Sequence, residues 1–212
     1  MSFYDLDSQS KLQRVEQLVA KDKDGVKQAE KVSEHSPGPV ADDELLARSL
    51  EYPNKFTDTG GLSDTLFQDA FTHGASAQRL IHGWEHHASD VHNRFEFRAK
   101  KRREGTDGRG PDPENLYIGA FHMTAAELRA CKLDTDTASR VRVYDAGEDS
   151  DQLHAEIFVD ATGLAKHQRK EMRVRLMVLA QQRGLFVSPH LSAEDLGRAE
   201  GTQCELHMPT VM

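Results

Sequence analysis

The sequence predicts an α+β fold, in which a small, mostly antiparallel or mixed β-sheet is packed by helices. The first observation is that residues 116–123, 141–144 and 153–160 have the hydrophobic patterns of strands. The second is a segment near 77–103 whose apolar residues recur with the period of a long helix. The third is the order of the elements, helices first and then strand, helix, strand, strand and helix. This order differs from the regular repeat of a parallel α/β sheet.

The three predicted strands each have a pattern of their own. Residues 116–123, LYIGAFHM, form a continuous apolar run of strand length. Residues 141–144, VRVY, alternate as a half-buried strand does, and residues 153–160, LHAEIFVD, contain consecutive residues of high β propensity. Thr124 and Glu127 have the spacing of a capping box, so we expect a short helix directly after the first strand.

The longest predicted helix is the one near 77–103. Leu80, Trp84, His87 or Ala88, Val91 and Phe95 recur at steps of three and four residues, and the other positions are polar. We therefore expect one side of this helix to be buried, while imidazole and guanidinium groups face outward on the other side.

Breaks in the pattern predict the domain organisation. Residues 1–35 are expected to form a helical N-terminal segment, because a thin apolar stripe runs through polar residues there. Residues 36–41, SPGPVA, predict a linker. Residues 42–190 are expected to form the α+β domain, beginning with a helix over 42–52 that ends before a proline. Residues 191–212 are expected to form a C-terminal tail.

Composition and charge favour a cytoplasmic protein that has no membrane partner. The chain is 37% hydrophobic and 29% charged, which is typical of an ordered but somewhat polar protein. Its net charge of -8 disfavours general binding to nucleic acid or to anionic membranes. Two distant cysteines, Cys131 and Cys204, form no CxxC pair and argue against a cysteine-based zinc site. The start lacks the pattern of a signal peptide, and no apolar run approaches the roughly 20 residues of a membrane span.

The common catalytic signatures are missing from the sequence. It contains no GxGxxG, GxxxxGK[ST] or GxSxG motif and no kinase signature. This disfavours the common classes of nucleotide enzyme and leaves three candidate sites.

The first candidate is a metal site on the long predicted helix. His82, His86 and Asp90 are four residues apart, which would stack their side chains along one helix face. Two imidazoles and a carboxylate can hold a divalent metal and leave a position for water, with Glu85 or Asp90 as the base. The alternative is a solvated polar face, because a histidine pair is a weak motif on its own.

The second candidate is a cation run near the end of the same helix. It could bind phosphate or an acidic partner, or it could simply complement the negative end of the helix dipole. We expect no base stacking on the run, because aromatic residues do not extend into it. The candidate residues for a partner or polyanion are Arg94, Arg98, Lys100, Lys101, Arg102 and Arg103.

The third candidate is the pair His154 and Glu156. Strand alternation places both side chains on one face, about 7 Å apart along the strand. A histidine and a carboxylate form a reasonable acid–base pair if they line a cleft. The alternative is an edge strand whose polar side faces water.

A resemblance covers residues 56–187. It rests on four stretches in this order: Phe56 followed by GGLS at 60–63, then IGAFHMTAAELRA, then HAEI at 154–157, and a last helix that ends at QRG, residues 182–184. In this order they resemble small uncharacterised bacterial proteins of mobile or phage-defence loci. The resemblance implies no activity and no functional residue, and the long histidine-rich helix departs from the pattern.

Two functional hypotheses follow from the sequence. The first is a non-enzymatic cytoplasmic interaction protein that binds a partner protein or an acidic surface through its basic helix end, without a cofactor. Another protein is the expected partner. Sequence-neutral binding of nucleic acid through Arg94 to Arg109 is a third and weaker hypothesis, which the net charge disfavours. The alternative is a metal-dependent hydrolase, with zinc or manganese as the metal and phosphodiesters as the expected substrates.

Overall fold

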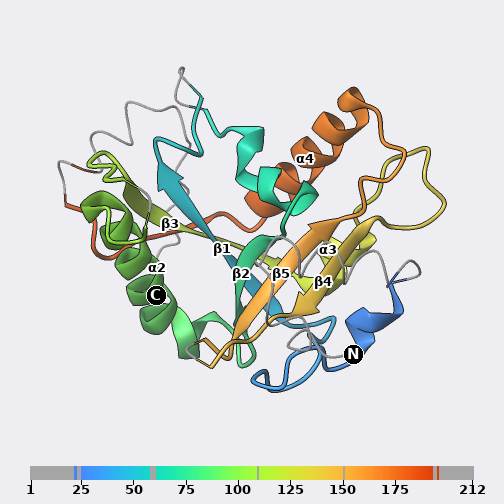
Figure 1. Ribbon diagram of the computed structural model, residues 1–212, viewed down its shortest axis with the longest axis horizontal. Coiled ribbons are helices and arrows are strands. Elements are labelled where there is room, and N and C mark those ends of the chain that lie inside the picture. Colours follow the sequence, from blue (N-terminus) through green and yellow to red (C-terminus); the bar gives the residue numbers. More distant parts are fainter. Residues whose placement is uncertain are drawn as a thin grey trace.

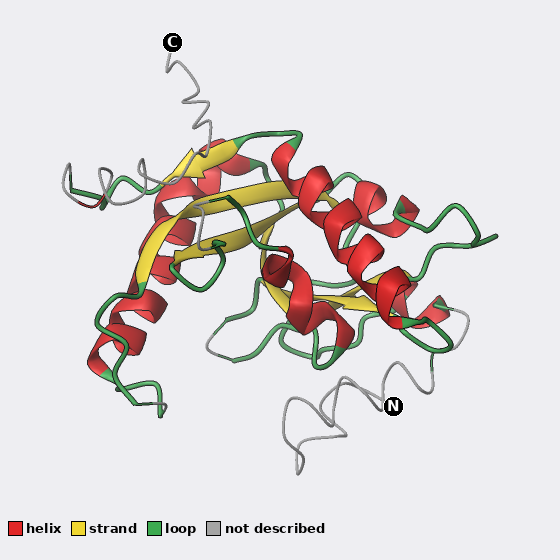
Figure 2. Cartoon of the chain, turned by 90° about the horizontal axis from the view of Figure 1, so that it is seen from above, coloured by secondary structure: helices red, strands yellow, loops and turns green. Residues whose placement is uncertain are grey.

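In the computed structural model, which describes residues 22, 25–57, 61–108, 110–149, 151–192 and 195, the chain forms a six-stranded sheet with helices on both faces (Figures 1 and 2). The side chains of residues 84–86 are not described. Every neighbouring pair of strands is antiparallel, and the strand order is β4-β5-β2-β1-β3-β6. The strands are β1 (Leu45–Tyr52), β2 (Ala75–Leu80), β3 (Leu116–Thr124), β4 (Val141–Asp145), β5 (His154–Val159) and β6 (Leu185–Val187). The α+β prediction is therefore confirmed.

Three α-helices and two 3₁₀ helices are described. They are η2 (Val26–Ala29), η3 (Asp64–Phe71), α2 (Trp84–Glu104), α3 (Ala125–Ala130) and α4 (Lys166–Gln181). On one face of the sheet, Leu46 and Leu50 of β1 share the larger core with η3, α3 and α4. On the other face, Ala47 lies in a smaller core with Val91 and Phe95 of α2. Alternate residues of β1 thus bury their side chains against helices on both faces of the sheet.

The strands that the sequence predicted near 116–123, 141–144 and 153–160 are β3, β4 and β5. The capping box is also present: the Glu127 N–H donates to Thr124 Oγ1 at 3.1 Å, and the Thr124 N–H donates to Glu127 Oε2 at 2.7 Å. These features were predictable because each depends on a local pattern of side chains.

The prediction of a helix over 42–52 is wrong, because Leu45–Tyr52 is the central strand β1. Leu46 and Leu50, four residues apart, suit a helix face, but they also share one face of a strand. Pairing decides between the two, since β1 has hydrogen-bonded neighbours on both sides. Tertiary context commonly overrides local propensity in this way.

The long helix near 77–103 is shorter than predicted. Residues Ala75–Leu80 form β2 between β1 and β5, and α2 begins at Trp84 after Gly83, whose φ is 83°. Within α2, Val91 and Phe95 are buried as expected, whereas the side chain of Trp84 is outside those described. Glycine suits this junction, since a residue with a side chain rarely adopts such a φ.

The segment 25–41 lies against β4 and β2. Asp145 at the end of β4 accepts the Val32 N–H at 2.8 Å and the hydroxyl of buried Ser36. Buried Arg79 on β2 donates to backbone carbonyls of residues 38 and 39. The stretch 36–41 therefore makes specific contacts with the sheet.

The remaining predicted segments lie mainly beyond the described residues. Of the helical N-terminal segment 1–35, residues 1–21, 23 and 24 are outside them, and the described part contains only the short η2. Most of the predicted tail 191–212 is outside them as well. Among the helices that are described, none has the length and apolar character needed to cross a membrane.

Candidate functional site

Strands β1 and β2 diverge within the sheet. They pair only at Leu45–Leu80, Leu46–Arg79 and Ala47–Gln78. Beyond these pairs β1 continues along β3, while the start of β2 runs along β5, and Figure 1 shows the two strands separating. The divergence leaves room between two strands that neighbour each other in the sheet.

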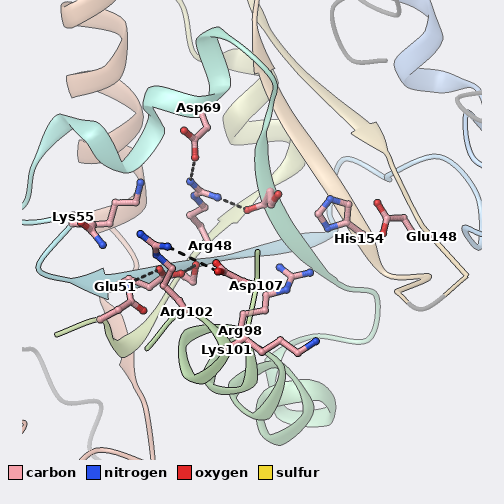
Figure 3. A pocket seen from close by; sticks show the side chains of 14 residues that line it. Arg48, Glu51, Lys55, Asp69, Arg98, Lys101, Arg102, Asp107, Glu148 and His154 are labelled. Atoms are coloured by element: carbon pink, nitrogen blue, oxygen red, sulfur yellow. Dashed lines mark hydrogen bonds and ion pairs between the residues drawn. The ribbon is translucent and has the colours of Figure 1, made fainter. Parts of the chain in front are cut away.

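A pocket of about 650 Å³ lies at this divergence (Figure 3). Residues of β1, the start of β2, η3, the C-terminal half of α2 and the β4–β5 turn surround it. Its lining residues are Arg48, Ser49, Glu51, Asn54, Lys55, Asp69, Ser76, Arg98, Lys101, Arg102, Asp107, Asn115, Glu148 and His154. The lining contains no large apolar side chain, which indicates a polar ligand.

The charge of the lining differs from that of the whole chain. Five side chains of the lining are cationic and four are carboxylates, while the chain as a whole has a net charge of -8. The cations are Arg48, Lys55, Arg98, Lys101 and Arg102, and the carboxylates are Glu51, Asp69, Asp107 and Glu148. The lining thus has one more cation than carboxylate, a mixed set of charges with a slight positive excess on an acidic protein.

Arg48 bridges the two diverging strands. Its guanidinium donates to the Ser76 carbonyl at 2.7 Å and to the Leu66 carbonyl at 3.1 Å, and it lies 3.4 Å from Asp69 Oδ2. The residue is only 5% exposed, and its Nε has no hydrogen-bond partner among the described residues. Arg48 is therefore a fixed cation at the base of the pocket rather than a flexible surface group.

Lys55 brings a second cation to the pocket from the loop after β1. Its ammonium donates to the Thr65 carbonyl at 3.2 Å. Burial, and after it the neighbouring Arg48 guanidinium, lower the pKa of Lys55 below its usual value. An anion in the pocket would oppose this shift, because a nearby negative charge favours the protonated amine.

The α2 cation run is largely engaged in ion pairs within the chain. Arg94 and Arg98 both reach Asp151, at 2.7 and 3.0 Å. Arg103 pairs with Glu96 at 2.6 Å. Lys100 lies 3.9 Å from Glu104, and Arg102 lies 3.9 Å from Asp107. The sequence could not show the pairing of Arg94 and Arg98, because Asp151 is distant along the chain.

Lys101 differs from its neighbours in the run. It lines the pocket, and its ammonium lies 4.6 Å from the centroid of the Phe97 ring. No carboxylate pairs with it in the part of the chain that the structure describes. Phe97 itself is 56% exposed. An aromatic face thus stands inside the cation run, which corrects the expectation that aromatic residues do not extend into it.

His154 and Glu156 lie on one face of β5, as strand alternation predicts. His154 Nε2 is 2.7 Å from Glu156 Oε1, and His154 Nδ1 is 4.0 Å from Asp151 Oδ2. The Ser76 hydroxyl donates to Glu156 at 3.3 Å. His154 lines the pocket, whereas Glu156 is fully buried beside it. Arg98 of the cation run also lines this pocket, so the structure joins two candidates that the sequence presented separately.

His82 and Asp90 of the predicted metal site do not line the pocket. His82 is in the turn before α2, so helical spacing applies only to His86 and Asp90. The His82 ring instead stacks near His87, with centroids 6.1 Å apart. The side chains of Glu85 and His86 are not among those described, and the metal set stays a prediction. Among the described side chains, no group of three His, Cys, Asp or Glu residues is placed to hold a metal ion.

Sequence reasoning missed Arg48 and Lys55 in particular. A signal for Arg48 was present, since it is the one charged residue within the apolar stretch LLARSL. Buried charges are rare and are paired when they occur, so an arginine at such a position is informative. Reading this stretch as a helix obscured the signal.

Comparison with known proteins adds no further assignment. No family model matches the chain, and neither a curated protein nor a solved structure matches it.

Proposed function

We propose that this chain is a non-enzymatic interaction protein that binds an acidic surface of a partner protein at the pocket beside the C-terminal half of α2. The observation that carries the proposal is the convergence of five cationic side chains on one pocket of a chain with net charge -8. These cations come from β1, from the loop after it and from α2. Because these cations are held by several elements of the fold, their relative positions are better fixed than those of cations on one flexible segment.

The cations of the pocket differ in how they can act on a ligand. Lys101 pairs with no described carboxylate, so it offers a full charge to a partner. Arg98 has a side chain that is 43% exposed and can exchange Asp151 for an incoming carboxylate. Arg48 is held by its bonds to Ser76 and Leu66 and contributes a fixed field. Complementary charge of this kind contributes more to specificity and association rate than to raw affinity.

A direct binding experiment tests the proposal. A fluorescein-labelled polyglutamate peptide is titrated with the full chain and with Lys101→Gln, and anisotropy is followed at low and high salt. We expect roughly fivefold weaker binding for the variant, because an exposed ion pair contributes up to about 1 kcal/mol. Binding of the full chain should weaken as salt rises. The matched control is Lys170→Gln, which removes the same charge from an exposed position on α4. Equal binding by all three proteins would refute the proposal.

The identity of a natural partner requires a second experiment. The resemblance to proteins of mobile or phage-defence loci suggests products of neighbouring genes as the first proteins to test. Size-exclusion chromatography with light scattering on the purified chain, alone and mixed with each product, measures complex formation directly. A complex that Lys101→Gln weakens supports the pocket as the binding site, and a complex indifferent to it places the interface elsewhere.

The alternative proposal is a metal-dependent hydrolase of phosphodiesters. The observation in its favour is the His154–Glu156 pair, which has the geometry of an oriented acid–base group and adjoins the pocket cations. It requires zinc or manganese at His82, His86 and Asp90, of which His82 and Asp90 do not line the pocket that His154 lines. Elemental analysis of the purified protein and of His86→Ala tests it. Absence of stoichiometric metal from the unsubstituted protein would remove this alternative.

A further inference from the structure

Phe97 is an aromatic side chain that the core does not use. Val91, Phe95 and Ala99 face the sheet from α2, whereas Phe97 lies two residues from Phe95 and therefore on the outer side of the helix. It is 56% exposed, although large aromatic side chains are usually among the more buried residues. The fold does not account for an aromatic residue at this position.

The surroundings of Phe97 on α2 are cationic. Arg94, Lys100 and Lys101 are three or four residues away, so their side chains are its neighbours on the helix surface. The Lys101 ammonium lies 4.6 Å from the ring centroid and also lines the pocket. The aromatic ring and the cationic pocket are therefore separated by one side chain.

This combination discriminates between classes of anionic ligand. An acidic peptide can pair with the cations, but it has no regular group that stacks on an aromatic ring. Single-stranded nucleic acid repeats a phosphate and an unpaired base at every nucleotide, and bases stack well on exposed aromatic side chains. A duplex exposes phosphates and base edges, but its base faces are stacked inside and cannot stack on an aromatic side chain.

We infer that the pocket and Phe97 together bind single-stranded nucleic acid, with a phosphate at Lys101 and Arg98 and the adjoining base stacked on Phe97. The inference rests on the proposed function insofar as both require the pocket to bind anions. It differs in the ligand, which is single-stranded nucleic acid instead of an acidic peptide, because only nucleic acid also uses the aromatic ring. Because the chain has a net charge of -8, only the local patch attracts the strand, and binding should be short-ranged and strongly dependent on salt.

The test compares two labelled probes on the full chain by fluorescence anisotropy. One probe is a single-stranded oligonucleotide of about twelve nucleotides, as oligothymidylate and as oligouridylate, since strands of about this length span one site. The other is polyglutamate. The variants are Phe97→Ala, Phe97→Trp and Lys101→Gln. The control is Val178→Ala, which shortens an apolar side chain on α4 that is 47% exposed.

For Phe97→Ala we expect about tenfold weaker binding of the oligonucleotides and unchanged binding of polyglutamate, because only stacking is lost. Phe97→Trp should retain oligonucleotide binding, Lys101→Gln should weaken both probes, and Val178→Ala should change neither.

The outcomes separate this inference from the proposed function. The inference is overturned if Phe97→Ala binds the oligonucleotides as tightly as the unsubstituted protein does. It is also overturned if Phe97→Ala weakens the binding of both probes equally. In either case polyglutamate binding that depends on Lys101 leaves the proposed function standing. If neither probe binds the unsubstituted protein, both the inference and the proposed function are refuted. Since Phe97 is exposed, its variants should melt at the same temperature as the unsubstituted protein, and a circular-dichroism melt checks this.

Discussion

At the scale of single residues, Arg48 shows how a buried charge can compensate for a break in a sheet. Where β1 and β2 separate, the Ser76 carbonyl receives a guanidinium N–H instead of a backbone N–H from β1. The same group also binds the Leu66 carbonyl of η3. One side chain thus satisfies acceptors on two other elements, and Arg48 also lines the pocket.

Replacing Arg48 by Met should lower the free energy of unfolding by about 3 kcal/mol, because the buried Leu66 carbonyl and the partly buried Ser76 carbonyl lose bonds to a charged donor. Denaturation in urea measures the loss. The control is Lys101→Met, which removes a cation from the same pocket at an exposed position and should change stability by less than about 0.5 kcal/mol. Similar stability of both variants would show that the bridging bonds contribute little.

His122 on β3 is a second residue whose burial has a measurable effect. Its ring stacks on Phe186, with centroids 3.9 Å apart, and burial lowers its pKa to about 3. The unfolded chain binds a proton near pH 6.5, whereas the folded chain does so only near pH 3. Stability due to this difference is therefore fully present above about pH 6.5 and decreases as pH falls toward 3.

The prediction concerns the slope of stability against pH between about 6 and 4. Replacing His122 by Gln should reduce this slope by up to about 1.4 kcal/mol per pH unit, because one titrating group is removed. Urea denaturation at several pH values measures it. A variant with the slope of the unsubstituted protein would contradict the shifted pKa.

At the scale of elements, α2 has two faces with separate roles. Phe95 packs on Tyr117 with ring centroids 5.5 Å apart and closes the smaller core. Phe97, half a turn away, faces outward among cations. The helix joins the parts of the sheet, because Phe95 contacts β3 while Arg94 and Arg98 reach Asp151 beside β5.

The two phenylalanines make a matched pair for a stability experiment. Phe95→Ala should cost about 3–5 kcal/mol, since it opens a cavity in a packed core. Phe97→Ala should stay within about 0.5 kcal/mol of the unsubstituted protein. Thermal and urea denaturation of both variants measure the difference. Comparable losses would mean that Phe97 is part of the core and not a surface aromatic.

At the scale of the whole molecule, the sheet consists of two three-stranded halves, β4-β5-β2 and β1-β3-β6, with the pocket between them. Gly119 of β3 allows the edge strand β6 to complete the second half. A Cβ built on Gly119 would lie 2.4 Å from the Phe186 carbonyl oxygen, so no side chain fits there without a shift of β6.

Gly119→Ala should therefore destabilise the fold by about 1–3 kcal/mol, because the added methyl overpacks a close contact between backbones. Faster hydrogen exchange at Leu185–Val187 should accompany the loss. Gly110→Ala is the control, since nothing lies within 4 Å of its added Cβ. Unchanged exchange in β6 would show that the strand accommodates the methyl group.

The sequence predicted β3, β4, β5 and the capping box because their patterns are local. It could not predict β1 and β2, since Leu45–Tyr52 and Ala75–Leu80 become strands through partners distant along the chain. Their own residues are compatible with helix.

For the candidate site too, the local patterns were predictable from the sequence and the contacts between distant segments were not. The cation run and the His154–Glu156 pair were both visible in the sequence. Their meeting at one pocket depends on the order of strands, and the pairing of Arg94 and Arg98 with Asp151 depends on the turn before β5. Neither the strand order nor this turn contact is encoded in a short motif.

The three residue pairs between β1 and β2 have a mechanical consequence. A fully paired ladder fixes the angle between adjacent strands, but here the two halves of the sheet share only a short seam. The opening angle beyond that seam is set by side chains such as Arg48 and by the brace of α2 across both halves. A ligand that fills the pocket and contacts both β1 and β2 would therefore fix this angle and hold the two halves of the sheet together as one rigid body.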